Sequence, residues 1–290
     1  MTVEIVATSL INGLMLGGLY ALVALGLTLI FGVLRVINFA HGSLMMLAMY
    51  ATFWLATRAG LDPYLALAVT VPGGFLVGWG LERLAIAPVL GAPEHSQLLM
   101  TLGLALFLDN LALALFTADP RTLLTPYSAA TVPLGPLRLN LPRLLAFGGA
   151  LGITAALAVF LRVTVLGRAV RAAAEERDGA ALVGIPVRRV YALAFGLGTA
   201  CVAAAGTLAV PFFYVSPEVG NTFVITAFVV VVLGGLGSFP GALLGGLAVG
   251  VVESLGGLVL HGSLAQIGVF LLFILVLLVR PTGLLGRAHA

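Results

Sequence analysis

Long apolar runs dominate the chain, and short breaks containing polar, glycine or proline residues separate them. No Asp, Glu, Lys or Arg lies between Glu4 and Arg35, and comparable uncharged intervals recur along the sequence. A helix of about 20 apolar residues crosses the hydrocarbon core of a bilayer. The pattern therefore predicts nine helices, over residues 5–33, 39–57, 64–86, 97–116, 144–162, 190–210, 222–237, 241–260 and 264–280.

The last three helices depend on turn signals alone, because Glu253 is the only Asp, Glu, Lys or Arg in residues 219–279. Their breaks are GGLGSFPG at 234–241 and LHGS at 260–263, where glycine and proline mark turns. A version with eight spans, in which one helix near the N-terminus is merged or lost, stays open.

The composition is typical of an integral membrane protein. Hydrophobic residues make up 61% and charged residues 9%, and the mean hydropathy is +1.18, whereas soluble domains carry about 25% charged residues. The fold class is therefore an all-α polytopic membrane protein with eight or nine transmembrane helices. Its N-terminus, MTVEIVATS, lacks the basic region of a signal peptide, so we expect the first apolar segment to remain in the mature protein.

Residue usage excludes two kinds of chemistry. All fourteen basic side chains are arginine, and a phosphate-binding P-loop needs a lysine, so this chain holds no P-loop and we expect it not to be an enzyme. Cys201 is the only cysteine, which rules out a disulfide within the chain. We also expect no metal site, no cofactor in this chain and no nucleic-acid partner.

Arginine placement predicts the orientation, because cytoplasmic loops of membrane proteins are enriched in basic residues. With the N-terminus outside and the C-terminus in the cytoplasm, ten arginines face the cytoplasm and four face outward. The ten are Arg35, Arg83, Arg162, Arg168, Arg171, Arg177, Arg188, Arg189, Arg280 and Arg287; the four are Arg58, Arg121, Arg138 and Arg143. The proline-rich loop 117–143 is then periplasmic, and it is either a plain connector or a docking surface for an external partner.

The cytoplasmic segment 163–189 breaks the apolar pattern with arginines and acids. Residues 168–183 are good helix formers, Arg171 and Glu175 are four apart and share a helical face, and Gly184 is placed to end the helix. The sequence predicts one short amphipathic helix, whose apolar content is Ala169, Ala173, Ala180, Leu182 and Val183. Such a helix either lies at the membrane surface or docks a partner and transmits its motion.

Three long motifs resemble the permeases of the LivH type, which are membrane subunits of ABC importers for branched-chain amino acids. They are GLYALVALGLTLIFGVLRVINFAHGSLMML (18–47), GRAVRAAAEERDGAALVGIPVRRV (167–190) and VVLGGLGSFPGALLGGLAVGVVESL (231–255). The resemblance implies one permease domain over residues 1–290 in the cytoplasmic (inner) membrane of a bacterium or archaeon. It also implies a second, LivM-like permease subunit, two cytoplasmic ATPase subunits and a periplasmic solute-binding protein that delivers leucine, isoleucine, valine or a related solute.

The resemblance also implies that segment 163–189 couples the permease to the ATPase. The contact residues it indicates are Arg171, Glu175, Glu176, Gly179, Gly184, Ile185 and Pro186. The match to the broader importer coupling motif is loose, because the two glutamates follow the alanines of 172–174 instead of preceding them.

Polar residues within the apolar runs are candidates for the translocation path, since a charge at the bilayer centre costs at least about 2.5 kcal/mol. The candidates are Asn38, His41, Asn110 and Glu253. Interhelical hydrogen bonding is the other interpretation, and it applies also to Asp109. Asn38 and His41 either cap the start of the second helix or line the inner mouth of the path.

Glycines recur every four residues near the C-terminus, at Gly237, Gly241 and Gly245, with Gly250 on an adjacent stripe. This spacing lets helices meet backbone to backbone, either within the chain or at an interface with another subunit.

Two other functional classes compete with the importer subunit. An ion-coupled secondary carrier would use Asp109, Glu253 or His41 as proton sites, and a channel or scaffold would transport nothing actively. The cytoplasmic helix favours the importer subunit, because a carrier that works alone has no need of a partner-docking helix there.

Overall fold

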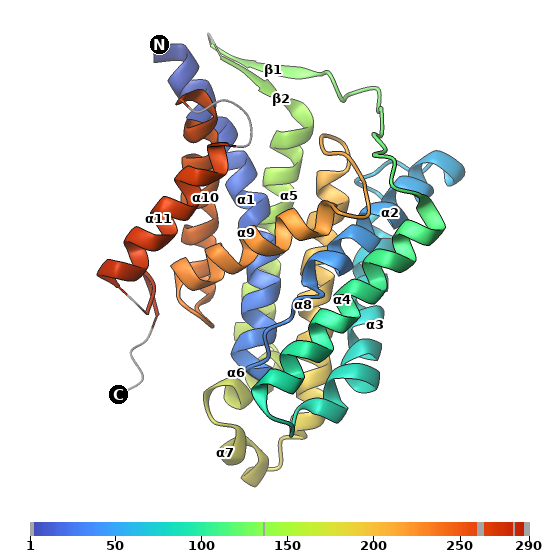
Figure 1. Ribbon diagram of the computed structural model, residues 1–290, viewed down its shortest axis with the longest axis vertical. Helices are drawn as coiled ribbons and strands as arrows, with labels where there is room; N and C mark the ends of the chain where they lie inside the picture. The colour runs from blue at the N-terminus through green and yellow to red at the C-terminus, as the bar shows by residue number, and fades with distance from the viewer. Residues whose placement is uncertain (1–2, 136, 260–263, 281, 287–290) are drawn as a thin grey trace.

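The computed structural model describes residues 3–135, 137–259, 264–280 and 282–286. All nine predicted apolar helices are present, with ends that differ by a few residues from the prediction (Figure 1). They are α1 (Val3–Leu34), α2 (His41–Ala59), α3 (Leu67–Leu81), α4 (Glu94–Phe116), α5 (Leu141–Val163), α8 (Val187–Ala209), α9 (Val219–Gly234), α10 (Phe239–Val259) and α11 (Ala265–Val279). The predicted turn at 260–263, Pro136 and Arg287 lie outside the described residues.

The all-α polytopic fold class is confirmed. Within the described ranges, five helices are long and apolar enough to cross a membrane, namely α1, α4, α5, α8 and α10, and α9 and α11 are shorter apolar helices. Beyond α3 the helical path continues through one π turn, η1 (Glu82–Ile86), and one 3-10 turn, η2 (Ala87–Val89). The chain is a multi-pass membrane protein.

The segments between the helices gather at two ends of the molecule. At one end a short antiparallel hairpin, β1 (Thr131–Leu134) and β2 (Leu137–Asn140), lies beside the first turns of α1 (Figure 1). At the other end the helices α6 (Val165–Glu175) and α7 (Arg177–Leu182) lie below the last turns of α1 (Figure 1). We call these the hairpin end and the α6–α7 end.

The proline-rich segment 117–143 is more ordered than a plain connector. Beyond the hairpin, its Arg121 exchanges both backbone hydrogen bonds with Val215, at 2.8 and 2.7 Å. Asn140 caps α5 by accepting a hydrogen bond from the Arg143 N–H at 3.2 Å. The segment is therefore tied to the loop between α8 and α9 and to the start of α5.

A polar cluster fastens this segment to the loop between α2 and α3. The Tyr127 hydroxyl donates to the Asp62 carboxylate at 2.7 Å, the Tyr64 hydroxyl donates to the Pro142 carbonyl at 3.0 Å, and the two rings stack with centroids 5.8 Å apart. Burial raises the pKa of both phenols, and the Asp62 carboxylate raises them further. Both phenols therefore stay protonated at physiological pH and keep donating.

Helices α1 and α8 form the centre of the bundle, and most of their residues are buried, whereas α4 and α5 lie at its periphery. Inside the bundle the Thr52 hydroxyl donates to Thr207 at 2.9 Å, and Thr207 donates to Thr70 at 2.7 Å. This chain of hydroxyls links α2, α8 and α3. Because each hydroxyl finds a partner, these threonines stay inside the bundle without an unpaired polar atom.

The glycine stripes of α10 contact two different helices of the same chain. Gly246 and Gly250 lie against α1, where a Cβ atom on Gly17 would stand 2.7 Å from the Gly246 carbonyl oxygen. Gly241 and Gly245 lie against α9, where a Cβ on Gly245 would stand 2.9 Å from the Val230 oxygen. Both stripes thus pack within the chain.

Gly237 does not belong to either stripe, contrary to the prediction. It precedes α10 in the turn between α9 and α10, and its φ of +79° is a left-handed value that favours glycine. The four-residue spacing grouped Gly237 with the glycines of α10, but α10 begins only at Phe239, and the turn before it includes Gly237.

Similar close approaches join the other central helices. A Cβ on Gly198 of α8 would lie 2.6 Å from the Gly26 oxygen of α1, and Gly42 of α2 meets the backbone of Gly220 in α9. In a bilayer the lipid tails are as apolar as the helices, so helices associate through close packing of this kind. The glycines therefore set the distances between α1, α2, α8, α9 and α10.

We predict that Gly17→Val destabilises the protein, because the added methyl groups must displace the backbone of α10. Overpacking of this kind costs about 1–3 kcal/mol. The matched control is Gly152→Val in α5, where an added Cβ meets nothing within 4 Å. Thermal unfolding in detergent should show a clear loss for the first variant and almost none for the second; equal losses would contradict the assignment of the α1–α10 contact.

Candidate functional site

The segment after α5 folds back on itself at Thr164. The Thr164 hydroxyl accepts a hydrogen bond from the Gly167 N–H at 2.9 Å and so caps α6. A Cβ on Gly167 would lie 2.5 Å from the Cα of Leu161, so only a glycine lets α6 pack this tightly against the end of α5. Val170 and Ala173 bury the inner face of α6. These contacts give α6 a fixed direction relative to the transmembrane helices.

The single helix predicted over 168–183 is wrong, because the chain breaks at Glu176. This residue is extended, with φ −147° and ψ 107°, and its carboxylate accepts a hydrogen bond from the Asp178 N–H at 3.3 Å. Glu176 thereby caps a second helix, α7, which the propensity of the alanines and glutamates does not reveal. Gly184 follows α7 with φ +83°, which is the helix-ending conformation expected of it.

The predicted coupling residues lie mostly on the surface of this unit. Arg171, Glu175, Glu176, Gly184 and Pro186 are exposed, and Gly179 and Ile185 are half-buried. The α6–α7 unit thus presents both charge signs to a partner.

Leu182 and Val183 depart from the expectation that they form the buried face of an amphipathic helix. They are 88% and 77% exposed at the tip of α7. The other side of α7 is held by buried Ala180 and by the Arg177 guanidinium, which stands 5.6 Å from the centroid of the Tyr191 ring of α8. We call Leu182 and Val183 the apolar tip.

The loop between α1 and α2 places Asn38 and His41 inside the protein, with no exposed surface. The Asn38 Oδ1 accepts a hydrogen bond from the Ala40 N–H at 3.1 Å, and the His41 Nε2 donates to the Val23 carbonyl of α1 at 3.0 Å. Asn38 precedes the helix and His41 is its first residue, so the two do not share a helical face.

This burial contradicts a role for Asn38 and His41 as lining of the path in this conformation, because a solute cannot touch either side chain. Asn38 Nδ2 and His41 Nδ1 are buried without a hydrogen-bond partner. Arg35, just before them, has a left-handed φ of 57°, which is rare for a residue other than glycine. The N-cap residue of α2 is Ala40 and no side chain caps this helix, so the N-cap interpretation of Asn38 is wrong. The observed contacts support a packing role for the pair.

Asn110 and Asp109 lie on the peripheral helix α4. Asn110 is exposed, and its amide donates to the Leu106 carbonyl of its own helix at 2.7 Å. Asp109 is half-buried, with one carboxylate oxygen that has no partner. Neither residue lies on the cavity that contains Glu253.

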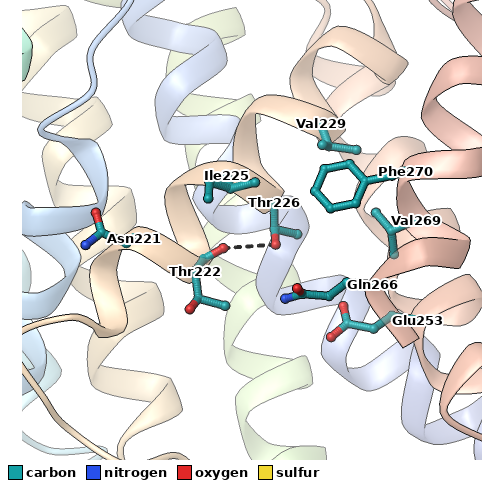
Figure 2. Close-up of a pocket in the computed structure, with 9 residues that line it drawn as sticks. All are labelled: Asn221, Thr222, Ile225, Thr226, Val229, Glu253, Gln266, Val269 and Phe270. Carbon is teal, nitrogen blue, oxygen red and sulfur yellow. Dashed lines mark hydrogen bonds between the residues drawn. The ribbon is translucent and has the colours of Figure 1, made fainter. Parts of the chain in front are cut away.

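Glu253 lines a cavity of about 170 Å³ between α9, α10 and α11 (Figure 2). The cavity has polar and apolar walls. The polar residues are Asn221, Thr222, Thr226 and Gln266, and the apolar residues are Ile225, Val229, Val269 and Phe270. Sequence reasoning missed all eight. The one available signal was Asn221, Thr222 and Thr226 on one side of an otherwise apolar helix, since positions four apart share a face.

The described part of the chain contains no group of three or more His, Cys, Asp or Glu side chains that could hold a metal ion.

Comparison with known proteins gives a consistent result. A family model described as branched-chain amino acid transport system / permease component matches residues 9–279. The chain is 35% identical to the high-affinity branched-chain amino acid transport system permease protein LivH of Escherichia coli K12, over 95% of this chain and 94% of the relative. It is 36% identical to the permease protein BraD of Pseudomonas aeruginosa, over 96% and 95%.

An archaeal relative is more distant. The probable branched-chain amino acid transport permease protein LivH of Methanocaldococcus jannaschii is 29% identical, over 92% of this chain and 89% of the relative. No solved structure matches the chain.

We predict that His41→Ala lowers stability, because it removes the bond to α1 and empties buried space; the expected loss is roughly 1–3 kcal/mol. The control is Asn110→Ala, which removes an exposed bond and should cost about 0.6 kcal/mol or less. Thermal unfolding of the detergent-purified protein separates the two. A stable His41→Ala protein that assembles normally yet loses transport would contradict the packing role and restore the role in the path.

Proposed function

The chain belongs to the branched-chain amino-acid transport permease family, and on this premise we propose that it is a membrane-spanning subunit of an ATP-driven importer. Its solutes are leucine, isoleucine, valine or related small molecules, as the names of its relatives indicate. The observation that carries the proposal is the exposed α6–α7 unit in a chain that has no lysine for a P-loop of its own.

The energy source of the importer is a separate protein. We infer two cytoplasmic ATPase subunits, a second permease subunit of the LivM type and a periplasmic solute-binding protein as partners. This chain then needs no cofactor, because its task is to provide the path and to follow the motion of the ATPase.

The orientation follows from the charges. Placing the N-terminus outside puts the α6–α7 end, with most of the arginines, in the cytoplasm and the hairpin end in the periplasm. The chain lies in the cytoplasmic membrane of a bacterium or archaeon. The ordered segment 117–143 then faces the side from which the binding protein arrives.

The α6–α7 unit has the construction expected of a mechanical coupler. Its tip presents two exposed apolar side chains, Leu182 and Val183, in a segment whose Arg177, Asp178 and Arg188 are also exposed. Exposed apolar groups among polar residues are typical of a protein-docking surface. Because α6 packs against α5, α8 and α1, a displacement of the tip is transmitted to the centre of the bundle.

A reconstitution experiment tests the proposed function. Proteoliposomes that contain this chain with its partner subunits and binding protein should accumulate leucine only when ATP is present on the side of the membrane where the ATPase subunits lie. Uptake by this chain alone, driven by a proton gradient, would overturn the proposal in favour of a secondary carrier.

We predict that Leu182→Ser lowers ATP-driven uptake about tenfold or more, while the unfolding temperature of the purified chain stays unchanged. The reason is that the side chain is exposed in this chain and buries apolar area only on docking, which is worth about 1.5–3 kcal/mol for a leucine. Uptake and stimulated ATPase activity of the reconstituted transporter provide the measurement.

The matched control is Leu124→Ser, because Leu124 is 87% exposed on the hairpin end. The substitution is the same, but it lies far from the proposed ATPase contact. It should therefore leave the coupling of ATP hydrolysis to uptake intact. Normal coupling in Leu182→Ser, or an equal loss of coupling in both variants, would discredit the apolar tip as the docking element.

A further inference from the structure

We propose that the cavity between α9, α10 and α11 is a binding site for an aliphatic amino acid within the transport path, with Glu253 accepting hydrogen bonds from its ammonium group. The proposal rests on the proposed function and deepens it, because it names the chemistry by which the membrane domain itself contacts the solute.

Among the residues that the structure describes, none that lines the cavity is a cation. Residues 219–279, which include α9, α10 and α11, contain no Lys or Arg. Outside these helices, the Tyr20 phenol of α1 lies beside Glu253, and a phenol is neutral. A buried carboxylate is costly unless a positive group pairs with it, and the ammonium of an amino acid is such a group.

The rest of the polar wall suits the opposite end of an amino acid. The amide groups of Asn221 and Gln266 and the hydroxyl of Thr222 are hydrogen-bond donors, and Figure 2 shows Gln266 beside Glu253 and Thr222 across from them. Donors of this kind bind a carboxylate. The wall therefore offers an acceptor for the ammonium and donors for the carboxylate.

The remaining wall matches an aliphatic side chain. Ile225, Val229, Val269 and Phe270 line it, and Figure 2 shows the last three on the side of the cavity away from Asn221. A volume of about 170 Å³ is smaller than the roughly 300–1,000 Å³ of pockets for drug-sized ligands. The site thus fits a single small solute with one polar and one apolar end.

The cavity is accessible from the surface of the chain. Asn221 and Gln266 are exposed at its rim, whereas Thr226 and Val269 are 8% and 5% exposed and form its floor. The cavity therefore opens at Asn221 and Gln266 and is closed off at Thr226 and Val269. Hydrogen bonding also supports the shape of the floor, since the Thr226 hydroxyl donates to the Thr222 carbonyl at 3.0 Å.

The first test replaces the carboxylate by its neutral isostere. In the complete reconstituted transporter, supplied with saturating binding protein, Glu253→Gln should lower leucine uptake by roughly ten- to a hundredfold, the effect of losing one charge-assisted hydrogen bond. Asp109→Asn is the matched control, because it neutralises another half-buried acid in a transmembrane helix that lies away from the cavity. It should keep uptake within about twofold of the unmodified transporter.

A second test does not depend on the folding of the Glu253 variant. Since Cys201 is the only cysteine and is buried, Cys201→Ala gives a background without thiols. Thr222→Cys in that background places a thiol in the cavity, and Leu271→Cys places one on α11, at a side chain that is 60% exposed and does not line the cavity. Labelling of both by a small methanethiosulfonate is followed in the complete transporter in nanodiscs.

L-Leucine should slow the labelling of Thr222→Cys severalfold and leave Leu271→Cys unchanged. The keto acid of leucine, which has the same side chain and carboxylate but no ammonium, should give no protection. Equal protection by the two compounds, or protection at both positions, would overturn the assignment of the ammonium to Glu253.

The outcomes separate this proposal from the proposed function. If the unmodified transporter imports leucine with ATP but Glu253→Gln imports it equally well, only the cavity assignment fails. If Glu253→Gln loses assembly and L-leucine does not protect Thr222→Cys, Glu253 is a packing residue and the assignment also fails. If the unmodified transporter imports no amino acid, both proposals fail together.

Discussion

The close approach of helix backbones to α1 is the constraint on which the rest of the structure depends. Gly17 meets Gly246 and Gly250 of α10, and Gly26 meets Gly198 of α8, at distances that leave no room for a side chain. Apolar side chains gain nothing from leaving lipid for a protein interior, so contact between smooth backbones supplies the packing energy instead. The central helices are thereby fixed at short and specific separations.

Tight packing at the centre also explains where polar groups are found. Hydroxyl hydrogen bonds run from Thr52 to Thr207 and from Thr207 to Thr70 and so link three helices. His41 hydrogen-bonds to the backbone of α1. Groups of this kind are held where helices already meet closely. The cavity beside Glu253 lies instead between α9, α10 and the outer helix α11, away from these hydrogen bonds (Figure 1).

Three regions thus divide the work of the molecule. The hairpin end is tied together by the Asp62, Tyr64 and Tyr127 cluster, which gives this end an ordered surface. The α6–α7 end presents the apolar tip to a partner and is anchored by Gly167 and Arg177. Between them, the helices that meet at glycines run from one end of the molecule to the other (Figure 1).

The sequence by itself determined the membrane class and the apolar segments that become helices, because the length of an apolar run is a local property. Its three long motifs also indicated the family. It also placed Gly241, Gly245 and Gly250 on packing stripes. It did not give the break at Glu176, since a side chain that caps α7 competes with the helix propensity of its neighbours. Only the tertiary structure decided that Asn38 and His41 are buried and that Leu182 and Val183 are exposed. It also decided that Glu253 shares a cavity with Asn221, Thr222 and Gln266. Which side chains are exposed and which residues they contact depend on which helix faces pack together. In a chain whose helices are apolar on nearly every face, the pattern of polar residues does not specify this packing.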